Sequence, residues 1–391
     1  MVATALEPLD AAMAARMLAD AAREARQIVP AGSGTKMRGM PIAPDALPLS
    51  SARLVTGLAH YAGDLVATVP AGARLHDVNA ALATQRQWLP LDPPFAAEAT
   101  IGGIVAANDS GPRRQRYGAP RDLIIGIEVA LTNGTVVHAG GRVVKNVAGY
   151  DLARLFCGSR GSLGMITSVT FKLAPMPHAS CTVVARFGSA ADAVSAALQL
   201  AASPLTPSTI ELSSPEPSLL VRFESTAGAT ERMAEAAAAI LAPASRDVAK
   251  VAGEAEARLW REYDEGRGAE GLTLQIALLP TASATVLNAI ERAAAEHGVS
   301  SKVVGRAALG VFRVAADGTS ESLIAFATAV RAAVHDVRGH LQVAGARDAL
   351  APQVAALADG SGSAAAVGEA VKLRFDPAGI LPYPWPRASR G

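Results

Sequence analysis

The sequence predicts an α+β protein in two parts, and two observations carry this prediction. Over residues 1–177, short β-like runs alternate with glycine-rich connections, whereas from Cys181 onward glycine thins out and strands alternate with alanine-rich helices. In the second part the order strand–helix–strand–strand–helix–strand occurs twice, which is the split βαβ arrangement of ferredoxin-like units. A chain of 391 residues is long enough for two or three domains with cores of their own. We therefore expect one domain over 1–177 and a second over 178–391.

The first part is expected to begin with a helix and a strand. Residues 10–26 are rich in alanine and place Met13, Met17 and Leu18 at helical spacing, and residues 28–30 read as a strand. Asn-Gly at 133–134 lies between two apolar runs, which predicts a β-hairpin. Glycine-rich connections are expected over 100–118 and 158–164. The other elements expected here are strands at 65–69, 124–131, 135–138 and 165–173 and a helix at 75–86.

The second part is expected to contain two βαββαβ units that are linked by a helix at about 254–266. Their sequences do not visibly match, so the repeat is inferred from the order of the elements alone. The first unit is expected as strand 182–187, helix 189–202, strands 208–213 and 218–225, helix 228–242 and strand 247–252. The second is expected as strand 272–279, helix 281–297, strands 301–306 and 309–315, helix 320–334 and strand 340–344.

Composition excludes several classes of protein. Lys and Arg number 36 against 35 Asp and Glu, so no charge excess favours nucleic acid. No stretch approaches about 18 uninterrupted apolar residues, and the N-terminus lacks the basic start and apolar core of a signal peptide. Two cysteines, Cys157 and Cys181, cannot build a disulfide framework, a four-thiolate metal site or an iron–sulfur cluster. We expect a soluble, cytoplasmic protein.

Three glycine clusters point to a phosphate-bearing ligand. The first, AGSGTK at 31–36, follows a strand but is neither a Walker A loop nor a Rossmann fingerprint, because Gly39 and Pro41 oppose the helix that a Rossmann site requires. A loop of small residues can still form a concavity of backbone N–H groups that binds anionic oxygens. Such a loop taken alone is more often a plain turn.

The second cluster, residues 99–111, has so few large side chains that a flat ligand could lie against its backbone. Thr100, Asn108 and Ser110 supply short hydrogen-bonding groups. A small-residue helix packed against a sheet is the open alternative. The third cluster covers 141–151 and 158–167, where Gly158, Gly161 and Gly164 favour a bend or a close ligand approach.

In this order, the segments AGSGTK, ATIGG, ANDSG, GGRVVKNVAGYDLARLF and GSRGSLGMIT resemble the FAD-binding domain of the vanillyl-alcohol-oxidase/PCMH flavoprotein family. The similarity covers roughly residues 25–177 and is strongest to the smaller FAD-binding subunits of glycolate oxidase (glycolate dehydrogenase). FDPAGIL at 375–381 is similar to the family's closing segment. The resemblance implies a bipartite PCMH-type FAD-binding domain, a ferredoxin-like cap or substrate domain, and a segment, 372–384, that returns to the FAD domain.

The resemblance also implies which residues contact FAD, largely through the backbone. It implies non-covalent FAD, because Thr35 and Lys36 follow the first loop where flavinylated relatives often have a histidine. Ala31 and Ser33 stand where glycines are common, and Arg160 stands where catalytic relatives usually have Glu. The cofactor-binding residues expected are Ala31, Gly32, Ser33, Gly34, Thr35, Lys36, Thr100, Ile101, Gly102, Gly103, Ala106, Ala107, Asn108, Ser110, Gly111, Gly161, Gly164 and Ile166.

Catalytic residues are less evident. Oxidation of a 2-hydroxy acid requires a cation for the carboxylate, a base for the hydroxyl proton and a flavin to take the hydride. The large catalytic relatives use a histidine-rich motif that 339–345 matches only in its first two residues, so His340 is expected at a strand end or on the surface, and no metal site is expected. The candidates are Lys145, Tyr150 and Arg261.

A basic cluster is formed by Arg113, Arg114, Arg116 and Arg121. It could steer an anionic substrate, face an acidic partner, or be a solvated charged loop.

The function implied is that of an FAD-binding subunit in a glycolate or 2-hydroxy-acid dehydrogenase complex. Such a complex oxidises glycolate to glyoxylate and contains a larger FAD-binding catalytic subunit and an iron–sulfur subunit that takes the electrons. Any association with a membrane would be peripheral and through these partners. Two alternatives stay open: a self-sufficient FAD-dependent dehydrogenase for D-lactate or another alcohol, and a non-catalytic structural flavin subunit.

Overall fold

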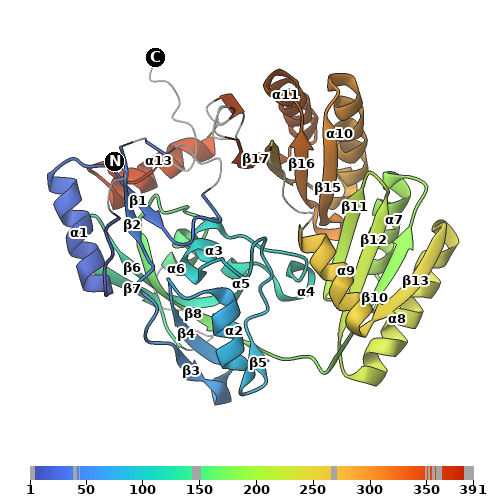
Figure 1. Cartoon of the computed structure of the whole chain (residues 1–391), viewed down its shortest axis with the longest axis horizontal. Coiled ribbons are helices and arrows are strands. Elements are labelled where there is room, and N and C mark those ends of the chain that lie inside the picture. Colours follow the sequence, from blue (N-terminus) through green and yellow to red (C-terminus); the bar gives the residue numbers. More distant parts are fainter. Residues whose placement is uncertain are drawn as a thin grey trace. The chain divides into compact units, whose positions relative to one another are not determined.

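The chain folds into two compact α+β units, as the sequence predicts (Figure 1). The computed structural model describes residues 5–37, 42–43, 45–142, 151–265, 271–347, 350, 353–354, 357 and 363–382. The first unit comprises Met1–Gly111, Tyr117–Met176 and Gly360–Gly391, and the second comprises Pro112–Arg116 and Pro177–Asp359. The chain therefore passes between the units after Gly111, Arg116, Met176 and Asp359, and the two domains expected over 1–177 and 178–391 stay a prediction.

The first unit contains a five-stranded sheet in the order β3-β4-β8-β6-β7, in which all neighbouring strands are antiparallel. The predicted hairpin at Asn133-Gly134 is confirmed as the β6–β7 turn, with Gly134 at φ +84°. The strands are β3 (Ala59–Tyr61), β4 (Val66–Pro70), β6 (Ile124–Ala130), β7 (Val136–Gly140) and β8 (Met165–Lys172). The helices include α1 (Ala11–Arg23), α2 (Leu75–Ala83), α6 (Leu152–Phe156) and α13 (Ser363–Phe375).

A second, two-stranded sheet of this unit leads into the first glycine-rich loop. Strand β1 (Ile28–Ala31) pairs in parallel with β2 (Leu47–Ser50), which the sequence did not predict. Strands β5 (Gln87–Trp88) and β9 (Ala174–Pro175) form another short pair. Because β1 is hydrogen-bonded up to Ala31, the AGSGTK loop leaves the sheet from a fixed point.

The expectation of a glycine-rich connection throughout 100–118 is wrong. Residues Ile101–Ala107 form helix α3, and single turns follow as α4 (Arg114–Tyr117) and α5 (Pro120–Leu123). Two glycines lower the helix propensity of α3, but tertiary packing outweighs this cost. A Cβ on Gly102 would lie 2.9 Å from the Cβ of Ala71, so glycine permits the helix to approach the chain after β4. The open alternative, a small-residue helix, is the one observed.

The second unit is an eight-stranded antiparallel sheet in the order β13-β10-β12-β11-β15-β16-β14-β17. It confirms the predicted βαββαβ repeat, and β11 joins β15 where the two halves meet. Its first half is β10 (Ala179–Arg186), α7 (Ala190–Ala201), β11 (Thr209–Ser214), β12 (Ser218–Ser225), α8 (Ala227–Leu241) and β13 (Asp247–Ala252). Its second half is β14 (Leu272–Ala277), α10 (Ser283–His297), β15 (Ser300–Arg306), β16 (Val311–Asp317), α11 (Ser320–Asp336) and β17 (His340–Ala346).

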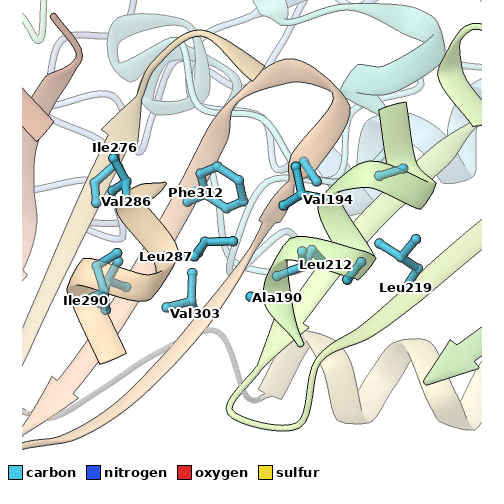
Figure 2. Close-up of a cluster of buried hydrophobic side chains, with 14 of the residues drawn as sticks. Ala190, Val194, Leu212, Leu219, Ile276, Val286, Leu287, Ile290, Val303 and Phe312 are labelled. Carbon is cyan, nitrogen blue, oxygen red and sulfur yellow. The ribbon is translucent and has the colours of Figure 1, made fainter. Parts of the chain in front are cut away.

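The core of this unit lies between one face of the sheet and helices α7, α8, α10 and α11. Figure 2 shows Leu287 and Ile290 of α10 beside Val303 and Phe312 of the strands. The linking helix α9 (Gly253–Glu265) covers the other face. There Tyr263 packs with Leu220 and Val304, whose side chains point away from the larger core because strand residues alternate.

Among the described residues, no helix is both long enough and apolar enough to cross a membrane.

Candidate functional site

A cavity in the first unit brings together parts of all three glycine clusters. Its empty volume is about 680 Å³, part of which is open to solvent. The predicted cofactor residues that line it are Ala31, Gly32, Ser33, Gly34, Thr35, Lys36, Thr100, Gly102, Gly103, Ala106, Ala107, Gly161, Gly164 and Ile166. Further lining residues that were not predicted are Val29, Pro30, Met37, Ser51, Arg160 and Met165. Of these, Arg160 carried a signal in the sequence as a departure from the family pattern, and Met165 lies in the GSRGSLGMIT segment that resembles the family.

The backbone of the first loop, residues 31–36, forms one wall of the cavity. The N–H of Ser51 donates to the carbonyl of Ala31 at 2.8 Å, which ties the start of the loop to the chain after β2. A Cβ on Gly32 would lie 2.1 Å from Oγ1 of Thr100, so only glycine permits this approach to the second cluster. Gly34 has a φ of +78°, and a Cβ there would meet open space. The loop thus faces the cavity without side-chain obstruction.

Helix α3 supplies the second wall, but not in the way the resemblance implies. Thr100 caps the helix, since its Oγ1 accepts from the N–H of Gly103 at 3.4 Å. The N–H groups of Ile101 and Gly102 donate to the carbonyls of Ala73 and Ala71 at 2.9 and 2.8 Å. Ile101 does not line the cavity at all. These two N–H groups are therefore used within the fold and are not donors to a ligand.

The third cluster is joined to the C-terminal half of α3. The N–H groups of Gly158 and Arg160 donate to the carbonyls of Val105 and Ala106 at 3.0 and 2.8 Å. Gly158, Arg160 and Gly161 all have positive φ angles, between +52° and +87°. These angles produce the bend that the glycines predicted, and they carry Gly161 against Pro30 at the end of β1.

Asn108, Ser110 and Gly111 do not line the cavity, so their contact with a cofactor stays a prediction. Asn108 ends α3 at φ +48°, and its Oδ1 accepts from the N–H of Arg121 at 3.2 Å and from Sγ of Cys157 at 3.4 Å. A Cβ on Gly111 would lie 1.8 Å from the carbonyl oxygen of Asp92. Asn108 and Gly111 are thus in contact with other parts of the chain, at Arg121, Cys157 and Asp92.

Two ionisable groups near the cavity have shifted pKa values. Burial lowers the pKa of the Arg160 guanidinium, and the carboxylate of Asp109 opposes this shift. Burial raises the pKa of the Cys157 thiol to about 12, against a smaller opposing effect of Arg121. Cys157 is therefore a neutral thiol at physiological pH and not a nucleophile.

The catalytic candidates are not brought to this cavity. Lys145 and Tyr150 lie outside the described residues. Arg261 is exposed on α9 in the second unit, next to Trp260, whose Nε1 donates to Oγ1 of Thr182 at 2.9 Å. His340 is the exposed first residue of β17, as predicted. Within the described part of the chain, no group of three or more His, Cys, Asp or Glu residues is placed to hold a metal ion.

The basic cluster is not simply a solvated loop. Arg113 makes a two-point contact with the carboxylate of Glu224 at 2.8 and 3.1 Å, and Arg116 donates to the carbonyl of Glu224 at 2.9 Å. Glu224 is 3% exposed. Burial alone would raise the pKa of Glu224, but Arg113 and Arg222 outweigh it and the pKa is lowered. The solvated-loop reading is therefore wrong for Arg113, which anchors residues 112–116 to the second unit.

The FDPAGIL segment is docked beside the strand that leads into the first loop. Lys372 and Asp376 are a buried ion pair, 1% and 0% exposed. Asp376 accepts from the N–H groups of Ile380 and Leu381 at 3.2 and 2.9 Å. The N–H of Ile28 in β1 then donates to the carbonyl of Ile380 at 2.8 Å. The described part of the predicted returning segment, 372–384, thus lies in the first unit.

Comparison with known proteins is consistent with this site. Residues 2–140 match the family described as FAD binding domain. The chain is 37% identical over 195 residues to glycolate oxidase subunit GlcD of Bacillus subtilis, which is 50% of this chain and 41% of that protein. It is 40% identical over 155 residues to glycolate oxidase subunit GlcE of Escherichia coli, 39% of this chain and 43% of that protein. It is 36% identical over 188 residues to the mitochondrial D-lactate dehydrogenase [cytochrome] of Arabidopsis thaliana, 47% of this chain and 32% of that protein.

These matches span less than half of each relative's length. A solved structure of alkyldihydroxyacetonephosphate synthase has a similar fold, with a TM-score of 0.73 at 16% identity over 96% of this chain and 75% of that one. Residues 2–140 therefore match an FAD-binding domain, and the chain is similar over part of its length to glycolate oxidase subunits and a D-lactate dehydrogenase.

Proposed function

We propose that this chain is the FAD-binding subunit of a glycolate or 2-hydroxy-acid dehydrogenase complex. The observation that carries the proposal is the cavity of the first unit, which is lined by the same segments that resemble the smaller FAD-binding subunits of glycolate oxidase. The 40% identity to glycolate oxidase subunit GlcE supports the same assignment.

The residues of the cavity fit FAD. Gly34 presents backbone to open space, and Gly32, Thr100 and Gly103 form a narrow wall next to it. In this proposal the loop at 32–35 holds the diphosphate, Ala106 and Ala107 lie on the flavin side, and Ile166 lies toward the adenine. When bound, FAD supplies the acceptor for the hydride of the 2-hydroxy acid.

The electrons are proposed to leave toward an iron–sulfur partner. Iron–sulfur clusters are typically held by four cysteine thiolates, and this sequence contains two cysteines, Cys157 and Cys181, both buried. In this proposal the larger subunit contributes the base that removes the hydroxyl proton. The steps assigned to this chain are to bind and orient the cofactor.

A second candidate is a self-sufficient D-lactate dehydrogenase, which the 36% identity to the Arabidopsis enzyme favours. The two are separated by steady-state turnover of the purified chain with glycolate or D-lactate and an artificial electron acceptor. We expect a flavin absorbance spectrum but turnover only after the partner subunits are added. Turnover by the chain alone would establish the second candidate, and the absence of flavin would favour a structural subunit.

The purified protein is expected to be yellow and to release its flavin on acid precipitation. Thr35 and Lys36 occupy the positions after the first loop, and neither is the histidine that often carries covalent flavin in relatives. The measurement is the absorbance of the supernatant and of the redissolved pellet. Flavin that stays in the pellet would contradict the non-covalent assignment.

His340→Ala is expected to change turnover of the assembled complex less than about tenfold. The residue is exposed at the start of β17, and removal of a true general base would cost roughly 10²–10⁴-fold. Flavin content and subunit stoichiometry of the variant must match wild type, so that a packing defect is not read as a catalytic one. A loss above about a hundredfold with both intact would give this chain a catalytic site of its own.

A further inference from the structure

Three charged side chains meet at one wall of the cavity. Nζ of Lys36 donates to the carbonyl of Pro94 at 2.5 Å and lies 2.8 Å from Oδ2 of Asp109. The side chains of Lys36 and Asp109 are at most 10% exposed. Arg160 interacts electrostatically with the same carboxylate. Lys36 and Arg160 line the cavity, whereas Asp109 does not. Asp109 thus pairs with Lys36 and acts electrostatically on Arg160, although it is not itself a lining residue.

The charges of this cluster suit an anionic ligand. The residues that line the cavity, so far as the structure describes them, include two cations and no carboxylate. A charge held away from water is stabilised by an opposite charge close by, and the three side chains together sum to +1. The diphosphate of FAD carries two negative charges, one of which the net positive charge of this cluster would offset.

The fold also creates a need for side-chain cations here. Helix α3 offers fewer amide donors than its sequence suggests, because the N–H groups of Ile101 and Gly102 are bonded to carbonyls of the preceding chain. Lys36 lies at this helix, with its Cγ 3.8 Å from where a Cβ of Gly103 would be. A hydrogen bond from a charged side chain would therefore add to the binding that the backbone of the loop at 32–35 provides.

The backbone presets the position of Arg160. Its φ is +52°, a conformation that is uncommon for a residue with a side chain. Its N–H is bonded to the carbonyl of Ala106, so the turn that carries Arg160 is attached to the end of α3. Strained backbone of this kind is often retained where it positions a functional group.

We propose that Arg160, which lines the cavity, binds the diphosphate of FAD, while Asp109, ion-paired with Lys36, is the nearby counter-charge of the guanidinium. Arg160 then distinguishes flavin bearing a diphosphate from riboflavin, and its planar fork can meet two phosphate oxygens at once. The inference rests on the binding of FAD in this cavity, and it holds whether or not glycolate is the substrate.

The test is binding of FAD, ADP and riboflavin to the apoprotein, since ADP carries the diphosphate without the flavin ring. Arg160→Gln is expected to lower the affinities for FAD and ADP by the same factor, about tenfold to a hundredfold. Its affinity for riboflavin should stay within twofold of wild type. Arg160→Lys is expected to restore most of the affinity for both, because the charge is kept. Arg23→Gln is the matched control, because it removes one positive charge from α1 in the same unit, where the side chain is 77% exposed, and it should change none of the three affinities.

Equal affinities of wild type and Arg160→Gln for FAD and ADP would overturn the proposal. A loss for FAD with unchanged ADP would also overturn it, because the guanidinium would then act on the flavin ring. If Arg160→Gln does not fold, the salt dependence of binding to the wild-type protein is the test. The affinity for ADP should fall as the salt concentration rises, while that for riboflavin should not. An ADP affinity that does not depend on salt would refute a cationic side chain at the diphosphate. Failure of wild type to bind FAD would instead refute the cofactor assignment, and lack of glycolate turnover by the assembled complex would bear only on the substrate.

Discussion

Gly103→Glu is expected to abolish retention of FAD while leaving the second unit folded. A Cβ at this position would lie 3.1 Å from Oγ1 of Thr100, and the longer side chain would extend into the cavity. Its carboxylate would repel the diphosphate and compete for Lys36, whose Cγ is 3.8 Å from the same point. Like charges a few ångströms apart at a partly buried site cost about 3–4 kcal/mol, so affinity should fall at least about a hundredfold. Visible absorbance of the purified variant is the measurement.

Three further variants separate the causes of this loss. Gly103→Ala adds only the Cβ and is expected to retain FAD. Gly103→Gln has the size of Glu without its charge, so its affinity should lie between those of the Ala and Glu variants. Gly63→Glu adds the same charge where a Cβ would meet nothing within 4 Å, and should bind FAD like wild type. If the Gly103→Glu variant bound as much FAD as wild type, α3 would not be part of the cofactor site.

Lys372→Met is expected to lower the melting temperature of the first unit by roughly 10 °C. The variant leaves Asp376, which is fully buried, without its cation, and breaking a buried ion pair costs about 3–5 kcal/mol. In a domain of this size each kcal/mol corresponds to about 2–4 °C. Fluorescence of released FAD during heating reports on this unit, because the Lys372–Asp376 pair docks the segment that is bonded to β1.

An exposed ion pair of the same unit provides the control. Arg154 and Asp151 lie 3.2 Å apart at 51% and 58% exposure, so Arg154→Met should change the melting temperature by no more than a few degrees. Adding Asp376→Asn to Lys372→Met removes the uncompensated charge and should recover part of the loss. A melting temperature of Lys372→Met within about 2 °C of wild type would show that the pair does not hold the segment.

Much of the fold could be predicted because its signals are local. The strands and helices of the two βαββαβ halves follow from runs whose periodicity is visible within each run, and their order then predicts the repeat. In the first unit, Asn133-Gly134 predicted its hairpin from turn chemistry alone. Strand β2 escaped prediction because Leu47–Ser50 is short and contains Pro48, and only its pairing with β1 makes it a strand.

In the candidate site, too, the features with local signals could be predicted and those that depend on distant contacts could not. The sequence by itself determined which glycine-rich segments form the cavity, since small residues in a recognisable order are a property of the chain. The tertiary structure decided that Ile101–Ala107 is a helix and that two of its N–H groups are already used. It also decided the pairing of Lys36 with Asp109, far along the chain, and the place of Arg160 beside them. The physical reason is that a charge's partner and a glycine's neighbour are set by contacts between distant segments, and these exist only once the backbone has folded.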